Sequence, residues 1–199
     1  MTPKQRIYLL GTITLLLFPL PALLALYYID GIPVLQTLDF GNFFSLYSLA
    51  GLGWGVLFAL IAIYCFQLKL FENELKKQEQ IILSLKLNLF DKIFLSFCAG
   101  FGEEVLFRAG VQHWLGIVIT SLLFIAVHGY FNPKNWKLSL YGLLLSPFII
   151  SLGYAYEHLG LWFCIAAHFA YDFVLFLEIK EDHSDTIKQL SYEESTDSG

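Results

Sequence analysis

Two adjacent glutamates and an arginine one helical turn later are the residues of this sequence best suited to chemistry. Glu103, Glu104 and Arg108 lie inside an apolar run, residues 93–111, that otherwise has the character of a membrane-spanning helix. Each ionisable side chain at the bilayer centre costs about 2.5–3.5 kcal/mol on the insertion scale. In a helix Glu104 and Arg108 share one face and can pair, whereas Glu103 is rotated by about 100°. The pattern predicts a neutralised pair beside a catalytic carboxylate, with a purely structural ion pair as the alternative.

Three further ionisable side chains lie within later apolar runs, and they are imidazoles and a carboxylate. His168 and Asp172 are four residues apart and therefore on one helix face, and His128 lies near the end of an earlier run. At 1.5 Å per residue, Glu103 and His168 lie about 16 Å and 18 Å deep, so these side chains could converge on one cavity. A carboxylate and an imidazole can deprotonate a bound water, and a second imidazole can stabilise the resulting oxyanion. The chemistry indicated is hydrolysis of an acyl bond at membrane depth.

The composition places these residues in a membrane protein. The chain has 199 residues, of which 57% are hydrophobic and 15% are charged, against about 25% charged in soluble domains. The net charge of −5 arises mainly from an acidic carboxy-terminal segment, and no basic patch suits a phosphate backbone. We therefore expect membrane lipids as partners and no nucleic-acid binding.

Hydrophobic patterning predicts an all-α, polytopic membrane helix bundle with about six transmembrane helices. Pro19 and Pro21 should kink the first helix, residues 30–42 and 132–135 should form loops, and His113-Trp114 should turn the chain between the third and fourth spans. The pattern of residues 69–88 is typical of an amphipathic surface helix. We expect one transmembrane domain, residues 1–180, and an acidic disordered tail, residues 181–199. The predicted spans are residues 7–28, 43–68, 91–112, 115–131, 136–156 and 161–179.

The distribution of basic residues predicts the orientation of this bundle. With six spans, every Lys and Arg except Arg108 falls on the amino-terminal side of the membrane. By the positive-inside rule both termini are then cytoplasmic. We expect an integral protein of the bacterial plasma membrane whose cavity opens toward the cytoplasm.

The order of three motifs resembles the CPBP family of intramembrane proteases, which includes CAAX prenyl endopeptidases and bacteriocin-processing or Abi-type proteins. The motifs are Glu103-Glu104-x-x-x-Arg108, Phe124-x-x-x-His128 and His168-x-x-x-Asp172, and the resemblance covers residues 89–179. It implies that Glu103 is the general base and that His128 helps to hold the water. It also implies that Glu104 and Arg108 keep the site together.

The last motif departs from the family at one position. The resemblance implies that His168 and the residue four positions later contact the oxyanion, and that residue is commonly Asn in the family, whereas this chain has Asp172. A carboxylate donates no hydrogen bond unless it is protonated, so orienting His168 suits Asp172 better.

Two mechanisms and one non-enzymatic reading remain open from the sequence. Members of the family that the chain resembles are described both as metalloproteases and as glutamate-type proteases that need no ion. If the ion is Zn²⁺, the candidate ligands are Glu103, His128 and His168, although no HExxH is present. The expected activity is cleavage of a peptide or membrane-protein substrate near the cytoplasmic face, of CAAX type or in bacteriocin or peptide processing. The alternative is a membrane immunity or scaffold protein that uses the same buried charges structurally.

Overall fold

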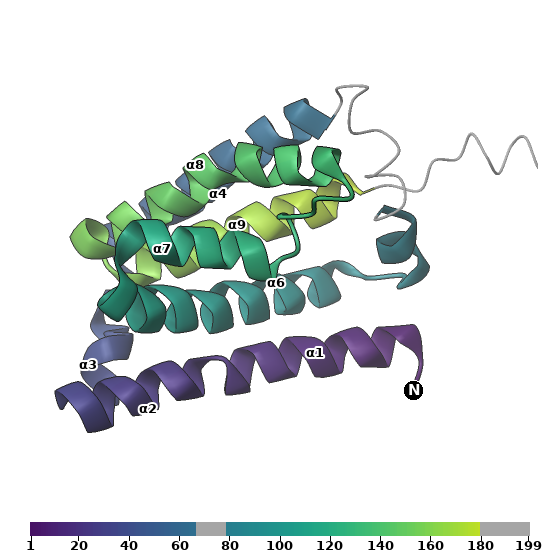
Figure 1. The fold of residues 1–199 in the computed structure, drawn as a ribbon. Coiled ribbons are helices and arrows are strands. Elements are labelled where there is room, and N and C mark those ends of the chain that lie inside the picture. Colours follow the sequence, from purple (N-terminus) through teal and green to yellow (C-terminus); the bar gives the residue numbers. More distant parts are fainter. Residues whose placement is uncertain (67–78, 180–199) are drawn as a thin grey trace, which may run out of the picture.

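The structure, a computed structural model, describes residues 1–66 and 79–179, and every regular element in these ranges is helical. The all-α class is therefore confirmed (Figure 1). One element, η2, is a π-helix that continues directly from α6. The elements are α1 (Pro3–Leu17), α2 (Pro19–Asp30), α3 (Val34–Leu38), η1 (Phe40–Asn42), α4 (Leu46–Phe66), α6 (Leu89–Glu104), η2 (Val105–Val111), α7 (Gln112–Val127), α8 (Trp136–Leu159) and α9 (Leu161–Glu178).

The amino-terminal third differs from the predicted pattern in one place. The first predicted span is interrupted at Phe18, and Pro19 begins α2, as expected for a residue that lacks a backbone N–H. Residues 30–42, predicted as a loop, instead contain the short helices α3 and η1. Of the predicted surface helix, residues 79–84 are helical and residues 69–78 lie outside the described part of the chain. The predicted acidic tail also lies outside it.

Within the described residues, five helical stretches are long and apolar enough to cross a membrane, where the sequence predicted about six. The third and fourth predicted spans fall in one stretch of 39 residues, Leu89–Val127, which as a straight helix would be about 58 Å long. That length is nearly twice the hydrocarbon core of about 30 Å. The stretch must therefore fold back. The five stretches are Pro3–Asp30, Leu46–Cys65, Leu89–Val127, Trp136–Leu159 and Leu161–Glu178.

The reversal within this stretch occurs at Gly116. Its backbone angles, φ 71° and ψ 173°, suit glycine because it has no Cβ, and α7 then runs back above α6 and η2 (Figure 1). The turn predicted at His113-Trp114 thus lies slightly further along the chain. The returning arm, residues 117–127, is only about 16 Å long, roughly half the hydrocarbon core. The membrane bundle is confirmed, and the fourth predicted span is a short arm that ends inside it.

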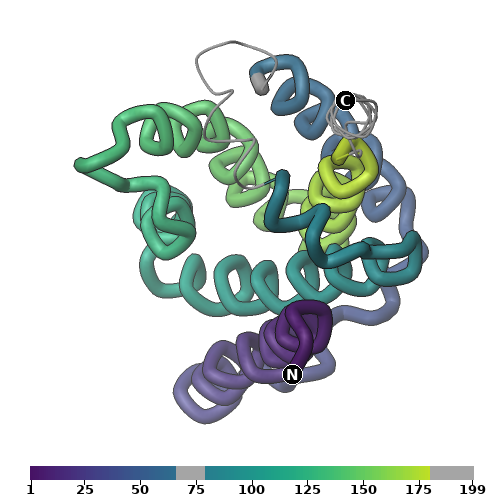
Figure 2. Tube along the Cα trace, turned by 90° about the vertical axis from the view of Figure 1, so that its right-hand side faces the viewer, coloured from purple at the N-terminus to yellow at the C-terminus, as the bar shows by residue number. Residues whose placement is uncertain are grey.

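The helix that carries the two glutamates lies at the centre of the arrangement. Seen from the end of the bundle, the row of α6 and η2 separates α1 and α2 from the other helices (Figure 2). On its opposite side α9 packs against both α6 and α4, and α7 packs against η2 and α8. α1 packs against α6 and α4 packs against α9, so these two helices support the helices that hold the glutamates and His168.

Two glycines let helix backbones approach closely behind the site. A Cβ on Gly55 would lie 2.0 Å from the carbonyl oxygen of Ala167, and a Cβ on Gly102 would lie 2.1 Å from that of Thr14. Real Cβ atoms do not approach backbone oxygen so closely, so both positions require glycine. Small residues are the usual means by which membrane helices pack tightly. Gly55 brings α4 against the residue that precedes His168, and Gly102 brings α1 against the residue that precedes Glu103.

Candidate active site

The predicted pair of Glu104 and Arg108 is formed at the junction of α6 and η2. Arg108 Nε donates to Glu104 Oε2 at 2.9 Å, and both side chains are 0% exposed. Glu104 is the last residue of α6, and Arg108 lies in the wider π-helical turn that follows. Short π-helical segments are rare and are frequently found at functional sites. The sequence spacing thus predicted this contact, but it gave no sign of the π-helix.

His168 on α9 is held by the other oxygen of the same carboxylate. Its Nδ1 lies 2.8 Å from Glu104 Oε1, so one fully buried carboxylate binds both Arg108 and His168. The opposite ring nitrogen, Nε2, lies 3.6 Å from Asp172 Oδ2 and 4.0 Å from Glu103 Oε2. The sequence assigned the orienting role to Asp172, whereas the closest carboxylate to the His168 ring is that of Glu104. Asp172 instead lies, like Glu103, beside the Nε2 atom of the ring.

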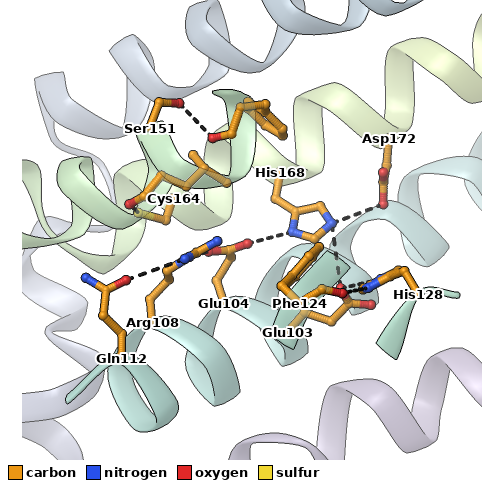
Figure 3. A network of polar contacts seen from close by, with 12 residues as sticks. Glu103, Glu104, Arg108, Gln112, Phe124, His128, Ser151, Cys164, His168 and Asp172 are labelled. Carbon is orange, nitrogen blue, oxygen red and sulfur yellow. Dashed lines mark hydrogen bonds and ion pairs between the residues drawn. The ribbon is translucent and has the colours of Figure 1, made fainter. Parts of the chain in front are cut away.

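His128 closes the site from the end of α7. Its Nδ1 lies 2.7 Å from the carbonyl oxygen of Phe124, which can only accept, so this nitrogen carries a proton. The ring also stacks on that of Phe124, with centroids 4.4 Å apart. These two contacts fix the ring so that its Nε2 lies 3.3 Å from Glu103 Oε2. Glu103, predicted to have no local partner, therefore faces imidazole nitrogens from two other helices (Figure 3).

The Oε2 atom of Glu103 is the least satisfied acceptor of the site. It is buried, and no described residue donates a hydrogen bond to it, because the nearby His128 nitrogen lacks hydrogen-bond geometry. A buried carboxylate oxygen without a donor is costly. Its surroundings, two imidazole nitrogens at 3.3 and 4.0 Å, are those in which a bound water would supply the missing donor.

Exposure rises across the site from one side to the other. The side chains of Glu104 and Arg108 are 0% exposed and that of Glu103 is 14% exposed, whereas those of Asp172 and His128 reach 26% and 32%. The site is therefore sealed behind the buried pair and opens beside His128 and Asp172. This opening coincides with the end of the short α7 arm, at Val127.

A buried polar chain extends from the sealed side, and the sequence analysis did not identify it. Arg108 Nη1 donates to Gln112 Oε1 at 3.4 Å, and Gln112 Nε2 donates to the carbonyl oxygen of Gly153 at 2.8 Å. The same Nε2 lies 3.4 Å from Glu157 Oε1. The sequence could have indicated this chain, because Glu104, Arg108 and Gln112 are each four residues apart and therefore lie on one helix face.

The three predicted zinc ligands lie together, but they do not form a metal-binding arrangement. Among the described residues, no group of three His, Cys, Asp or Glu side chains has the geometry to hold a metal ion. The ring nitrogens of His128 and His168 that face Glu103 are free of other strong hydrogen bonds, and their second nitrogens are held by a carbonyl and a carboxylate. Each ring is thus oriented by a contact of its second nitrogen within the protein.

The segment that carries all six side chains matches a known family. Residues 85–174 match the sequence model described as type II CAAX prenyl endopeptidase, Rce1-like. The match begins just before α6 and ends within α9, so α1 to α4 lie outside it. The resemblance to CPBP intramembrane proteases that the three motifs indicated is confirmed for this segment.

One curated relative is similar over a region of comparable length. The chain is 35% identical over 92 residues to the uncharacterized protein YpbD of Bacillus subtilis (strain 168), which covers 46% of this chain and 47% of that protein. The chain thus spans about half the length of this relative. The relative is itself uncharacterized, so the similarity indicates no activity. No solved structure matches the chain.

Proposed function

With the segment around the site related to the CPBP intramembrane proteases, we propose that this protein is an intramembrane endopeptidase of CAAX type. One observation carries the proposal: the buried Glu103 Oε2 lacks a hydrogen-bond donor and faces the Nε2 atoms of His128 and His168. The two imidazoles are within ion-pair distance of this oxygen, but neither gives it a hydrogen bond. A carboxylate that takes a proton from water needs an oxygen that is not already occupied by a hydrogen-bond donor.

In the proposed reaction Glu103 is the general base. A water held between Glu103 Oε2 and His128 Nε2 gives a proton to the carboxylate while its oxygen attacks the carbonyl carbon of the scissile peptide bond. The same proton then passes to the leaving nitrogen as the carbon–nitrogen bond breaks. The products are a carboxylic acid, which releases its proton to water, and an amine, and Glu103 returns to its ionised form. A positioned general base of this kind contributes about 10²–10⁴-fold to the rate.

His168 is the proposed stabiliser of the oxyanion. Its Nδ1 proton is held by Glu104, so Nε2 is the nitrogen that faces Glu103, and it donates when the ring is protonated. Arg108 holds the Glu104 carboxylate in place, and it acts only through that carboxylate. Asp172, whose Oδ2 lies 3.6 Å from the same Nε2, is a positioning residue in this scheme.

The accessible side of the site defines how substrate enters. The exposed edge beside His128 and Asp172 lies at the end of the short α7 arm, so a peptide can reach the buried carboxylate from one membrane face. By the positive-inside rule we assign this face to the cytoplasm. The family description favours a prenylated Cys-a-a-X carboxy terminus as substrate. The second candidate is an unprenylated peptide, as in bacteriocin processing.

The test compares purified wild type with Glu103→Gln in proteoliposomes. The probes are two internally quenched peptides of the same sequence ending in Cys-a-a-X, one farnesylated and one not. Gln keeps the size and shape of the side chain but is no base, so we expect kcat to fall by about 10²–10⁴-fold. Glu178→Gln, an exposed glutamate at the end of α9, is the matched control and should cleave as wild type does.

Each outcome assigns a function. Cleavage that depends on Glu103 supports the peptidase, and the preferred probe identifies the substrate class. Equal turnover by Glu103→Gln would end the catalytic assignment of this residue. No cleavage of either probe by wild type would favour the immunity or scaffold role. Repeating the assay with a chelator tests for a metal requirement.

A further inference from the structure

Gln112 is a buried amide whose contacts join the site to a helix that contributes no residue to it. It begins α7, is 5% exposed, and is four residues beyond Arg108. Its carbonyl oxygen accepts from Arg108 Nη1 at 3.4 Å, and its amide nitrogen donates to the Gly153 carbonyl oxygen of α8 at 2.8 Å. Because both ends are engaged, the amide cannot rotate without breaking a contact.

The guanidinium of Arg108 has few other restraints. Its Nε is bound by Glu104, its Nη2 has no partner among the described residues, and the ring of Phe124 lies 5.8 Å from Cζ. Gln112 is therefore the group that fixes the far end of the guanidinium. The near end holds the carboxylate of Glu104, which in turn holds the ring of His168.

The backbone of α8 is shaped to receive this amide. A Cβ on Gly153 would lie 3.2 Å from Gln112 Oε1, 3.5 Å from Arg108 Nη1 and 2.6 Å from Ile117 Cγ2. Glycine at this position lets the α8 carbonyl reach the amide and leaves room for the guanidinium. The contact between α7 and α8 is thus built around the polar chain.

We infer that Gln112 is a positioning residue of the proposed peptidase: it orients Arg108, and through Glu104 it sets the ring of His168. This inference rests on the proposed function for its kinetic consequence only. The orientation of His168 can be measured whether or not the protein cleaves a peptide. A residue that only packs α7 against α8 would leave that ring unchanged.

The first experiment is independent of activity. In protein labelled with ¹⁵N-histidine, Gln112→Met keeps the size of the side chain and removes both hydrogen bonds. We expect the Nδ1 resonance of His168, assigned with a His168→Gln variant, to shift, and that of His128 to stay. Glu157→Ala is the matched control, because it removes the other acceptor of the same amide without touching Arg108. An unchanged His168 resonance in folded Gln112→Met overturns the inference.

The second experiment is a double-mutant cycle on kcat for the cleaved probe. Gln112→Met alone should lower kcat by about 10-fold or more, the range for a hydrogen bond to a charged group, with KM little changed. In an Arg108→Lys background the same change should have little further effect, because the guanidinium that it orients is absent. If the two losses in kcat instead multiply in the double variant, Gln112 acts independently of Arg108 and has a role in packing alone. If wild type cleaves neither probe, the histidine resonances still decide the inference.

Discussion

Replacing Arg108 by methionine should destabilise the folded protein by about 3 kcal/mol. Both members of the pair are fully buried, so the substitution leaves the Glu104 carboxylate inside the bundle without its countercharge. Breaking a buried ion pair from one side typically costs about 3–5 kcal/mol. Glu104 keeps its 2.8 Å contact with His168, which places the expected loss at the lower end.

The measurement is thermal unfolding in one detergent, followed by circular dichroism. For a chain of this length, 1 kcal/mol corresponds to about 2–4 °C, so Arg108→Met should lower Tm by about 6–12 °C. The control is the double variant Glu104→Gln/Arg108→Met, which removes both charges and keeps an acceptor for His168 Nδ1. Since replacing a whole buried pair is often close to neutral, we expect it to recover most of the loss.

Two results would refute this reasoning. A Tm for Arg108→Met within about 2 °C of wild type would mean that the carboxylate is solvated or protonated rather than paired. A double variant as unstable as the single one would mean that the loss comes from the packing of the arginine side chain and not from an uncompensated charge.

Three further predictions concern the cavity, the packing and the orientation. Asp172→Asn keeps an acceptor near His168 Nε2 and should retain activity within a few-fold, whereas Asp172→Ala should lose about 10-fold or more; comparable inactivity of both would make the carboxylate itself essential. Gly55→Ala should lower stability by about 1–3 kcal/mol because its Cβ would meet the Ala167 carbonyl, while Gly53→Ala, with open space around it, should melt as wild type does. Single cysteines at positions 36 and 158 should react with an impermeant maleimide from outside the cell and one at position 134 only after lysis; the reverse pattern would turn the site to the other face.

The sequence predicted those contacts that follow from one helix alone. The spacing of Glu104 and Arg108 fixes their relative position to within one turn, and the observed pair agrees. The order of the three motifs likewise predicted that the glutamates, His128 and His168 meet. The pair follows from local geometry, whereas the meeting of the three motifs was inferred from the types, depths and order of their residues.

Contacts between helices were harder to predict because they depend on rotation about each helix axis. Which carboxylate holds His168 is decided by the rotation of α9 against α6, and the structure selects Glu104 over Asp172. Gln112 was missed because an amide in an apolar run has no charge to mark it. The turn was predicted two residues too early because Gly116, between two apolar segments, resembles any other small residue of a membrane helix.

The short arm of α7 has a consequence for the membrane as a permeability barrier. A hydrolase buried in a bilayer must admit water without becoming a leak for protons and other ions. Because the arm covers roughly half of the hydrocarbon core, water can reach Glu103 from one face, while the buried pair of Glu104 and Arg108 and the amide of Gln112 close the path to the other. The proposed hydrolysis would therefore consume water at depth while the opposite leaflet stays electrically insulating.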